Sequence, residues 1–240
     1  MGTNSSVPWT THSWGLHYGC KKVSTGCDNC YAERDMTRYG KDFYKVTRAK
    51  DATFYKPALW HEPAKVFVCP WSDFFILNAD EWRPEAWRII KEHKHLTFQI
   101  LTKRPERIEK CLPIDWGKGY PNVWLGVTVE SIDCLNRINK LAGIPAISKF
   151  ISAEPLLDDL GGYLRDNPIR LMRTGIEWII AGCESGQNVR ETKIEWVRNL
   201  RDFCIKHNIK FFLKQLRKED GGLVEMPKLD GVIYDQIPER

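Results

Sequence analysis

The sequence predicts an α/β fold in the form of a partial or complete (β/α) TIM-like barrel with parallel strands. Short apolar runs recur along the chain, as is typical of strands that are buried on both faces. Most of these runs are followed by polar residues and then by a helical pattern. Alternation of strands and helices implies parallel strands joined by right-handed crossovers. Six or seven such units fit a barrel better than a small open sheet.

The expected strands are apolar runs of a few residues each. The first lies around residues 9–14 and leads directly into a segment that contains three cysteines. The others cover residues 66–69, 98–101, 123–127, 149–151, 178–181 and 210–213.

Helical spacing predicts the connecting elements. Apolar residues three apart predict a helix over 132–141, with Ser131 as a cap and with Gly143 and Pro145 ending it. The same spacing predicts helices over 194–203 and 82–94. We expect a single domain over residues 1–240, with a cysteine loop at 15–31 after the first strand and a loop-rich C-terminal cap at 217–240.

The composition narrows the class of protein. No run of eighteen apolar residues occurs, which argues against a membrane span, and the N-terminus lacks the charged start and apolar core of a signal peptide. Eight cysteines without such a signal favour a reducing compartment, so we expect a cytoplasmic protein without a disulfide framework. The formal net charge of +5 permits an anionic ligand or nucleic acid without requiring one.

The most informative motif is a set of three cysteines, Cys20, Cys27 and Cys30, within eleven residues. Thiolates bind soft metals, and two cysteines separated by two residues can reach one centre. A 4Fe-4S cluster on three cysteines leaves one iron open, whereas a structural zinc site takes four protein ligands. His12 or His17 could supply a fourth ligand to zinc, and a zinc hydrolase with a bound water is a further alternative.

Polar residues follow the predicted strands at their carboxyl ends. Ligands bind at that edge of parallel sheets. We therefore expect these side chains to form a ligand site: Asp73, Lys103, Arg104, Thr128, Glu130, Ser152, Glu154, Glu184, Lys214 and Gln215.

Several segments carry a family resemblance. The run Cys20-x6-Cys27-x2-Cys30-Tyr31 and the segments 24–32, 98–105, 122–130, 152–157, 178–186 and 211–215 resemble the phage-associated three-Cys-motif family. The function of that family is not established, and the family is itself related to the radical SAM enzymes. The resemblance covers nearly the whole chain.

The link to radical SAM enzymes implies a 4Fe-4S cluster on Cys20, Cys27 and Cys30, with S-adenosylmethionine chelating the fourth iron. Cleavage of that cofactor, fed by an electron donor, would generate a 5′-deoxyadenosyl radical. The first cysteine gap has six residues instead of the usual three, and Pro70-Trp71-Ser72-Asp73 replaces the usual Gly-Gly-Glu. We assign S-adenosylmethionine to Asp73, Thr128, Glu130, Ser152, Glu154 and Glu184, and substrate to Lys103, Arg104, Lys214 and Gln215.

A weaker signal lies in residues 34–50, which contain six basic residues, two acids and interleaved aromatics. Basic residues neutralise phosphates and aromatics stack on bases, so a nucleotide or nucleic-acid substrate is one interpretation. A solvated amphipathic helix is the other. The leading hypothesis is thus an iron–sulfur enzyme of radical SAM type, and the alternative is a nucleic-acid-binding module with structural zinc that works beside a partner enzyme.

Overall fold

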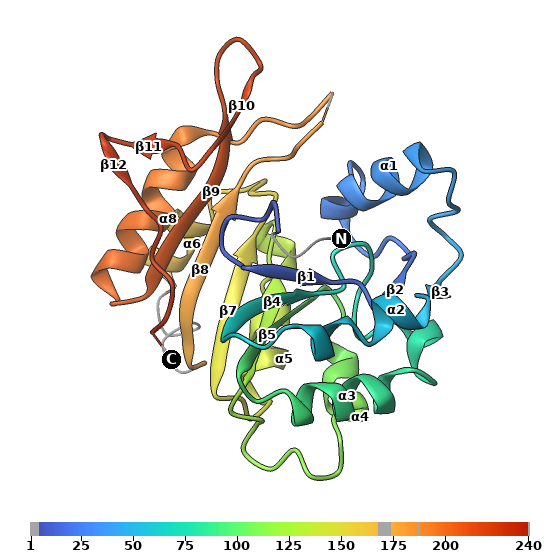
Figure 1. Cartoon of the computed structure of the whole chain (residues 1–240). Coiled ribbons are helices and arrows are strands. Elements are labelled where there is room, and N and C mark those ends of the chain that lie inside the picture. Colours follow the sequence, from blue (N-terminus) through green and yellow to red (C-terminus); the bar gives the residue numbers. More distant parts are fainter. Residues whose placement is uncertain (1–4, 168–173, 187, 240) are drawn as a thin grey trace. The chain divides into compact units, whose positions relative to one another are not determined.

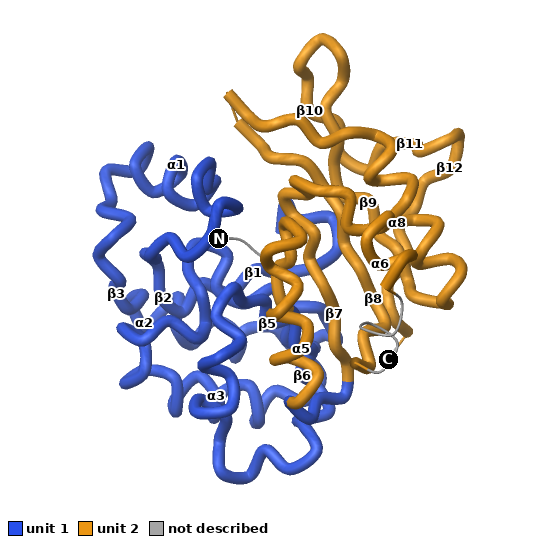
Figure 2. The backbone as a smooth tube through the Cα atoms, turned by 180° about the vertical axis from the view of Figure 1, so that it is seen from behind, with its two compact units in different colours: residues 1–126, 144–147 blue, residues 127–143, 148–240 orange. Residues whose placement is uncertain are grey.

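The computed structural model describes residues 5–167, 174–186 and 188–239 (Figure 1). The chain divides into two compact units (Figure 2). Unit 1 comprises Met1–Gly126 and Ile144–Ile147, and unit 2 comprises Val127–Gly143 and Ser148–Arg240. The expected single domain over 1–240 stays a prediction.

Unit 1 is built on parallel strands. β1 (His12–Trp14) pairs with β4 (Ala64–Val68), which pairs with β5 (Leu96–Thr102), each in parallel. The core on these strands is rich in aromatic residues: Trp14 lies 5.7 Å from Phe98 between ring centroids, and its indole nitrogen donates to the Phe54 carbonyl at 2.9 Å.

The division between the two units falls within β6 (Val123–Thr128). The remaining elements of unit 1 connect and cover its parallel strands. They are β2 (His17–Tyr18), η1 (Thr25–Cys27), α1 (Tyr31–Arg38), β3 (Thr47–Arg48), α2 (Asp51–Phe54), η2 (Lys56–Leu59), η3 (Leu77–Ala79), α3 (Arg83–Glu92), η4 (Pro105–Arg107), α4 (Ile108–Cys111) and β6 (Val123–Thr128).

Unit 2 repeats the strand–helix alternation. β7 (Ser148–Ala153), β8 (Ile176–Gly182) and β9 (Lys210–Arg217) pair in parallel in that order. α8 (Ile194–Lys206) packs against β9, and α6 (Leu160–Asp166) packs against α8 (Figure 1). The others are η5 (Ile132–Cys134), α5 (Asn136–Ala142), β10 (Leu223–Glu225), β11 (Lys228–Leu229) and β12 (Val232–Ile233).

The predicted α/β class with parallel strands is confirmed. Each apolar run from residue 66 onward lies in or at the end of a strand, and the structure extends most strands by one to four residues because residues that flank the runs also pair. The helices predicted over 82–94 and 194–203 are α3 and α8. Closure of the strands into a TIM-like barrel stays a prediction.

Two local features differ from expectation. Ser131 starts the 3-10 helix η5, but its hydroxyl faces the Cys134 sulfur at 3.6 Å and does not cap the helix. The strand predicted to end at Cys69 ends one residue earlier, since Cys69 adopts a left-handed φ of 58°. In the described part of the predicted C-terminal cap, β10 pairs antiparallel with β9, and the loop-rich character of the cap stays a prediction.

Within the described ranges, no helix combines the length and the apolar composition needed to cross a lipid bilayer.

Candidate functional site

The parallel strands of unit 1 end in register. Trp14 is paired with Val68, and Val68 with Ile100, so the segments that follow these strands start along one edge. The loop that carries the cysteines is held there by two hydrogen bonds to the segment after β4. Gly19 donates its N–H to the Trp71 carbonyl at 3.1 Å, and the Ser72 hydroxyl donates to the Gly19 carbonyl at 2.5 Å.

Glycine is required at position 19 because of its backbone and its surroundings. Its φ is 91°, a conformation that side chains disfavour, and a Cβ would lie 2.4 Å from the Lys45 carbonyl oxygen. This close approach brings the cysteine loop against residues 43–46, where Cys20 donates its N–H to the Phe43 carbonyl at 2.7 Å. The sequence analysis did not anticipate this contact.

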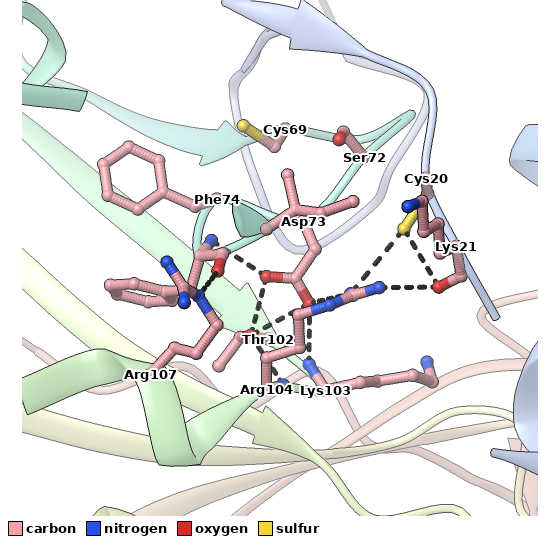
Figure 3. A network of polar contacts seen from close by, with 12 residues as sticks. Cys20, Lys21, Cys69, Ser72, Asp73, Phe74, Thr102, Lys103, Arg104 and Arg107 are labelled. Carbon is pink, nitrogen blue, oxygen red and sulfur yellow. Dashed lines mark hydrogen bonds and ion pairs between the residues drawn. The ribbon is translucent and has the colours of Figure 1, made fainter. Parts of the chain in front are cut away.

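Asp73 is the centre of the polar network at this edge (Figure 3). Its buried carboxylate accepts from the Thr102 hydroxyl at 2.7 and 2.9 Å, from the N–H groups of Phe75 at 2.9 Å and Lys103 at 3.0 Å, and from the Arg104 guanidinium at 2.9 Å. Together these donors bind both oxygens of the Asp73 carboxylate. Asp73 is thereby placed to organise the loops after β4 and β5.

Arg104 connects this network to the cysteine loop. Its guanidinium donates to the Lys21 carbonyl at 2.6 Å and lies 3.7 Å from the Cys20 sulfur, while it pairs with Asp73. Both Arg104 and Asp73 are less than 10 % exposed at their side chains. A cation beside a sulfur favours the thiolate form, which is the form that binds metals. In Figure 3 the neighbouring Lys103 side chain extends away from Asp73.

The three cysteines are free thiols of intermediate exposure. Cys20 and Cys30 both pack against a small hydrophobic cluster of Ala32, Met36 and Phe43. Burial raises the pKa of Cys20 to about 11, although Arg104 opposes this shift. Metal binding at Cys20 would therefore have to release a proton at neutral pH.

The structure does not gather the cysteines into a finished ligand set. Across the ranges that the structure describes, no three His, Cys, Asp or Glu side chains lie close enough to hold a metal ion. Cys27, at the end of η1, has its sulfur 4.0 Å from the Ser24 hydroxyl. The donor set itself, three half-buried thiols on one loop with a guanidinium beside the first, suits a soft metal or an iron–sulfur cluster.

The two nearby histidines are packed among other groups. His12 stacks on Trp60 with ring centroids 4.4 Å apart and an interplanar angle of 17°. His17 is fully buried, and its Nε2 lies 3.5 Å from the sulfur of Cys69. Burial lowers the pKa of His17 to about 3, against the attraction of Asp73. His17 is therefore neutral in the folded protein at physiological pH.

This burial predicts a pH dependence of stability. In the unfolded chain His17 takes up a proton near the ordinary histidine pKa of 6.5, whereas the folded protein resists protonation down to about pH 3. The part of the free energy of unfolding that depends on neutral His17 is therefore fully present above pH 6.5. It is lost as the pH falls below 6.5, by about 1.4 kcal/mol per pH unit. Urea unfolding at pH 7 and pH 5 should show the free energy falling by about 2 kcal/mol more in the wild type than in His17→Gln. Equal losses would contradict this account.

The strand ends of unit 2 carry a second polar group. Ala153 pairs with Ala181 and Ala181 with Leu213, so the residues after them share an edge. There the Glu154 carboxylate pairs with the Lys214 ammonium at 2.9 Å and accepts from the Ser152 hydroxyl at 3.1 Å. Three of the predicted residues, which belong to the ends of two different strands, are thus brought together.

The neighbouring predicted residues have other partners. Gln215 donates its amide to the Cys183 carbonyl at 2.7 Å. The buried Glu184 carboxylate accepts from the Arg190 backbone at 2.8 Å and from its guanidinium. Gln215 and Glu184 therefore fix the loops at this edge.

Glu130 and Thr128 lie in a buried ion-pair network. The Arg137 guanidinium donates to the Glu130 carboxylate at 2.7 Å and to the Thr128 carbonyl at 2.8 Å. The Glu130 side chain is 0 % exposed and that of Arg137 is 9 % exposed. Burial and pairing of this kind are typical of a structural role, although Glu130 was assigned to the cofactor from its position after a strand.

The sequence analysis missed several partners of these residues. Thr102 directly precedes the predicted Lys103, so the strand-end rule could have found it. Arg137 and Arg190 lie six or seven residues beyond the acids with which they pair, and no spacing rule in loops identifies such pairs. Cys69 is predicted only as the last residue of a strand, and its left-handed backbone and its contact with His17 appear first in the structure.

The fold and its edges define a mixed α/β protein with charged and thiol side chains at the carboxyl ends of parallel strands. The family model described as "Protein of unknown function (DUF5131)" matches residues 4–238, and the chain belongs to this family. No curated protein and no solved structure gives a significant match.

Proposed function

We propose that the protein is an iron–sulfur enzyme of radical SAM type that acts on a nucleotide or nucleic-acid substrate. The observation that carries the proposal is the loop of three free, half-buried cysteines after β2, which Arg104 and Ser72 anchor at the carboxyl edge of parallel strands. Active sites of parallel α/β folds lie at this edge. The TIM-like barrel and the relation to phage-associated three-Cys-motif proteins belong to the same proposal.

The residues of the chain have distinct parts in it. Cys20, Cys27 and Cys30 would hold the 4Fe-4S cluster, and the Arg104 guanidinium would offset the negative charge of the thiolates. Bound there and reduced by one electron from a donor, the cluster and S-adenosylmethionine would supply radical chemistry that abstracts a hydrogen atom from the substrate. Asp73 orients Arg104 and so positions the loop. The assignments of Glu154, Ser152 and the other strand-end acids to cofactor, and of Lys103, Lys214 and Gln215 to substrate, remain predictions, as do an electron donor and a cytoplasmic location.

The alternative, a nucleic-acid-binding module with structural zinc, needs a fourth protein ligand. The contacts of His12 with Trp60 and of His17 with Cys69 do not favour either ring as that ligand. We therefore rank this function below the first.

Replacing the cysteines tests the cluster. After anaerobic purification, Cys20→Ser, Cys27→Ser and Cys30→Ser should each retain less than about a third of the wild-type iron, because serine is a poor ligand for iron–sulfur clusters. Cys111→Ser is the matched control, since Cys111 is also a free thiol of intermediate exposure. Iron content that is unchanged in the first three variants, or that falls equally in the control, would contradict the assignment.

Binding of S-adenosylmethionine is tested separately, by EPR spectroscopy of the reduced wild-type protein. The proposal predicts that the cofactor changes the cluster signal. An unchanged signal would leave an iron–sulfur protein without this chemistry.

A further inference from the structure

The helix that follows the cysteine loop has two different faces. Ala32 and Met36 are buried in the hydrophobic cluster that also contacts Cys20 and Cys30. Tyr31, Arg34 and Arg38, at positions i, i+3 and i+7 of α1, are exposed. Residues three and seven apart lie on one side of a helix, so one aromatic ring and two guanidinium groups share the outer face.

Exposed aromatic rings continue beyond the end of α1. Tyr39 is 65 % exposed, and its ring centroid lies 5.7 Å from that of the half-buried Trp71. Tyr44 is 54 % exposed and packs edge-on against the buried Phe43. Each exposed tyrosine ring therefore packs on a more buried aromatic neighbour and keeps part of its surface open to solvent, where a ligand can contact it.

These residues are tied to the cysteine loop through Glu33. The Glu33 carboxylate pairs with Lys22 at 2.8 Å and accepts from the Tyr44 hydroxyl at 2.9 Å. The loop, α1 and the segment around Tyr44 are therefore neighbours, although they lie up to 22 residues apart in the sequence. We call the exposed part of this region the α1 surface: Tyr31, Arg34, Arg38, Tyr39, Tyr44 and Lys45.

The charge of this region is positive and only partly compensated, since Lys22, Arg34 and Arg48 have acidic partners. Residues 20–50 contain eight Lys and Arg residues and four acids, which gives +4 of the net charge of +5 of the chain. Glu33 already pairs with Lys22, and Asp35 lies 3.7 Å from Arg34. No carboxylate in the described ranges pairs with Arg38, Lys45 or Lys50, and all three are exposed.

We propose that the α1 surface binds single-stranded nucleic acid. Cations arranged among exposed aromatic rings suit a strand whose phosphates pair with Arg and Lys and whose bases stack on tyrosine. A duplex offers the same phosphates but keeps its base faces covered, so the aromatic rings favour a single strand. That the bound strand is also the substrate rests on the proposed function, because the surface adjoins the cysteine loop.

Fluorescence anisotropy with labelled oligothymidine and oligouridine tests the binding between about 50 and 200 mM salt. Tyr39→Ala should weaken binding by about 5- to 150-fold, which corresponds to the loss of one stacked base. Arg34→Gln with Arg38→Gln should reduce the slope of log Kd against log salt by about 1.4, because each phosphate contact contributes about 0.7. The control pair Lys94→Gln with Lys110→Gln removes the same charge from exposed positions on other segments of unit 1 and should leave both quantities unchanged.

Three results would overturn the inference. The control pair could lose as much affinity and salt dependence as the Arg34 and Arg38 variant, or duplex could bind as tightly as single strands. Polyglutamate could also bind as tightly as the single-stranded oligonucleotides. Urea unfolding of each variant confirms that it is folded. Iron is measured in the same samples, so that the two proposals fail separately. If a protein without iron binds the oligonucleotides in a salt-dependent way, the proposal for the α1 surface is supported and the proposed cluster is contradicted. If the protein contains iron but does not bind the oligonucleotides, the cluster is supported and the proposal for the α1 surface is contradicted.

Discussion

Replacing Arg104 with alanine is expected to destabilise the protein by about 3–5 kcal/mol, the usual cost of removing one partner from a buried ion pair. Arg104 is 6 % exposed and Asp73 is 5 % exposed, and their atoms are 2.9 Å apart. The change leaves a buried carboxylate with hydroxyl and N–H donors but without its cation. It also removes the hydrogen bond to the Lys21 carbonyl that anchors the cysteine loop.

The measurement is the free energy of unfolding in urea at pH 7. Arg88→Ala is the matched control, because Arg88 makes ion pairs of 2.6 Å with Glu85 and Glu92 on an exposed helix face. Exposed pairs contribute little, so the control should lose less than about 1 kcal/mol. A loss of that size in Arg104→Ala as well would mean that Arg104 does not hold the network together.

Replacing Arg137 with leucine should have a comparable effect in unit 2, again about 3–5 kcal/mol. The substitution removes the guanidinium from the fully buried Glu130 carboxylate and from the Thr128 carbonyl. Because apolar pairs often replace buried ion pairs at little cost, the double variant Arg137→Leu/Glu130→Leu should be more stable than Arg137→Leu alone.

Urea unfolding again measures the loss, and Arg198→Ala serves as the control because its pair with Asp230 at 2.8 Å is exposed. A double variant that is less stable than the single one would contradict a structural role for the Glu130–Arg137 pair. It would restore the interpretation of Glu130 as a residue kept for a ligand.

Most of the local fold could be predicted from the sequence because the strands are buried on both faces. Runs such as 178–181 are apolar throughout, and the structure places them inside strands. Strand ends were predicted less well. At the end of β4, for example, Val68 and Cys69 are both apolar and both buried, so the sequence does not separate them. Only the left-handed backbone of Cys69 shows that the strand ends at Val68.

The site could be predicted only in part. The strand-end rule correctly brought Ser152, Glu154 and Lys214 to one edge, because parallel strands in register end together. The rule could not distinguish a polar side chain that is available to a ligand from one that already has hydrogen-bond or ion-pair partners within the protein. Asp73 and Glu130 look alike in the sequence, yet their partners Arg104 and Arg137 depend on tertiary packing that no local pattern records.

The central claim is that Cys20, Cys27 and Cys30 hold an iron–sulfur cluster, and metal analysis tests it most directly. Wild-type protein purified without oxygen should contain about four iron and four sulfide per chain and show a broad visible absorption that bleaches on reduction. A colourless protein that contains zinc and no iron would contradict the proposed function.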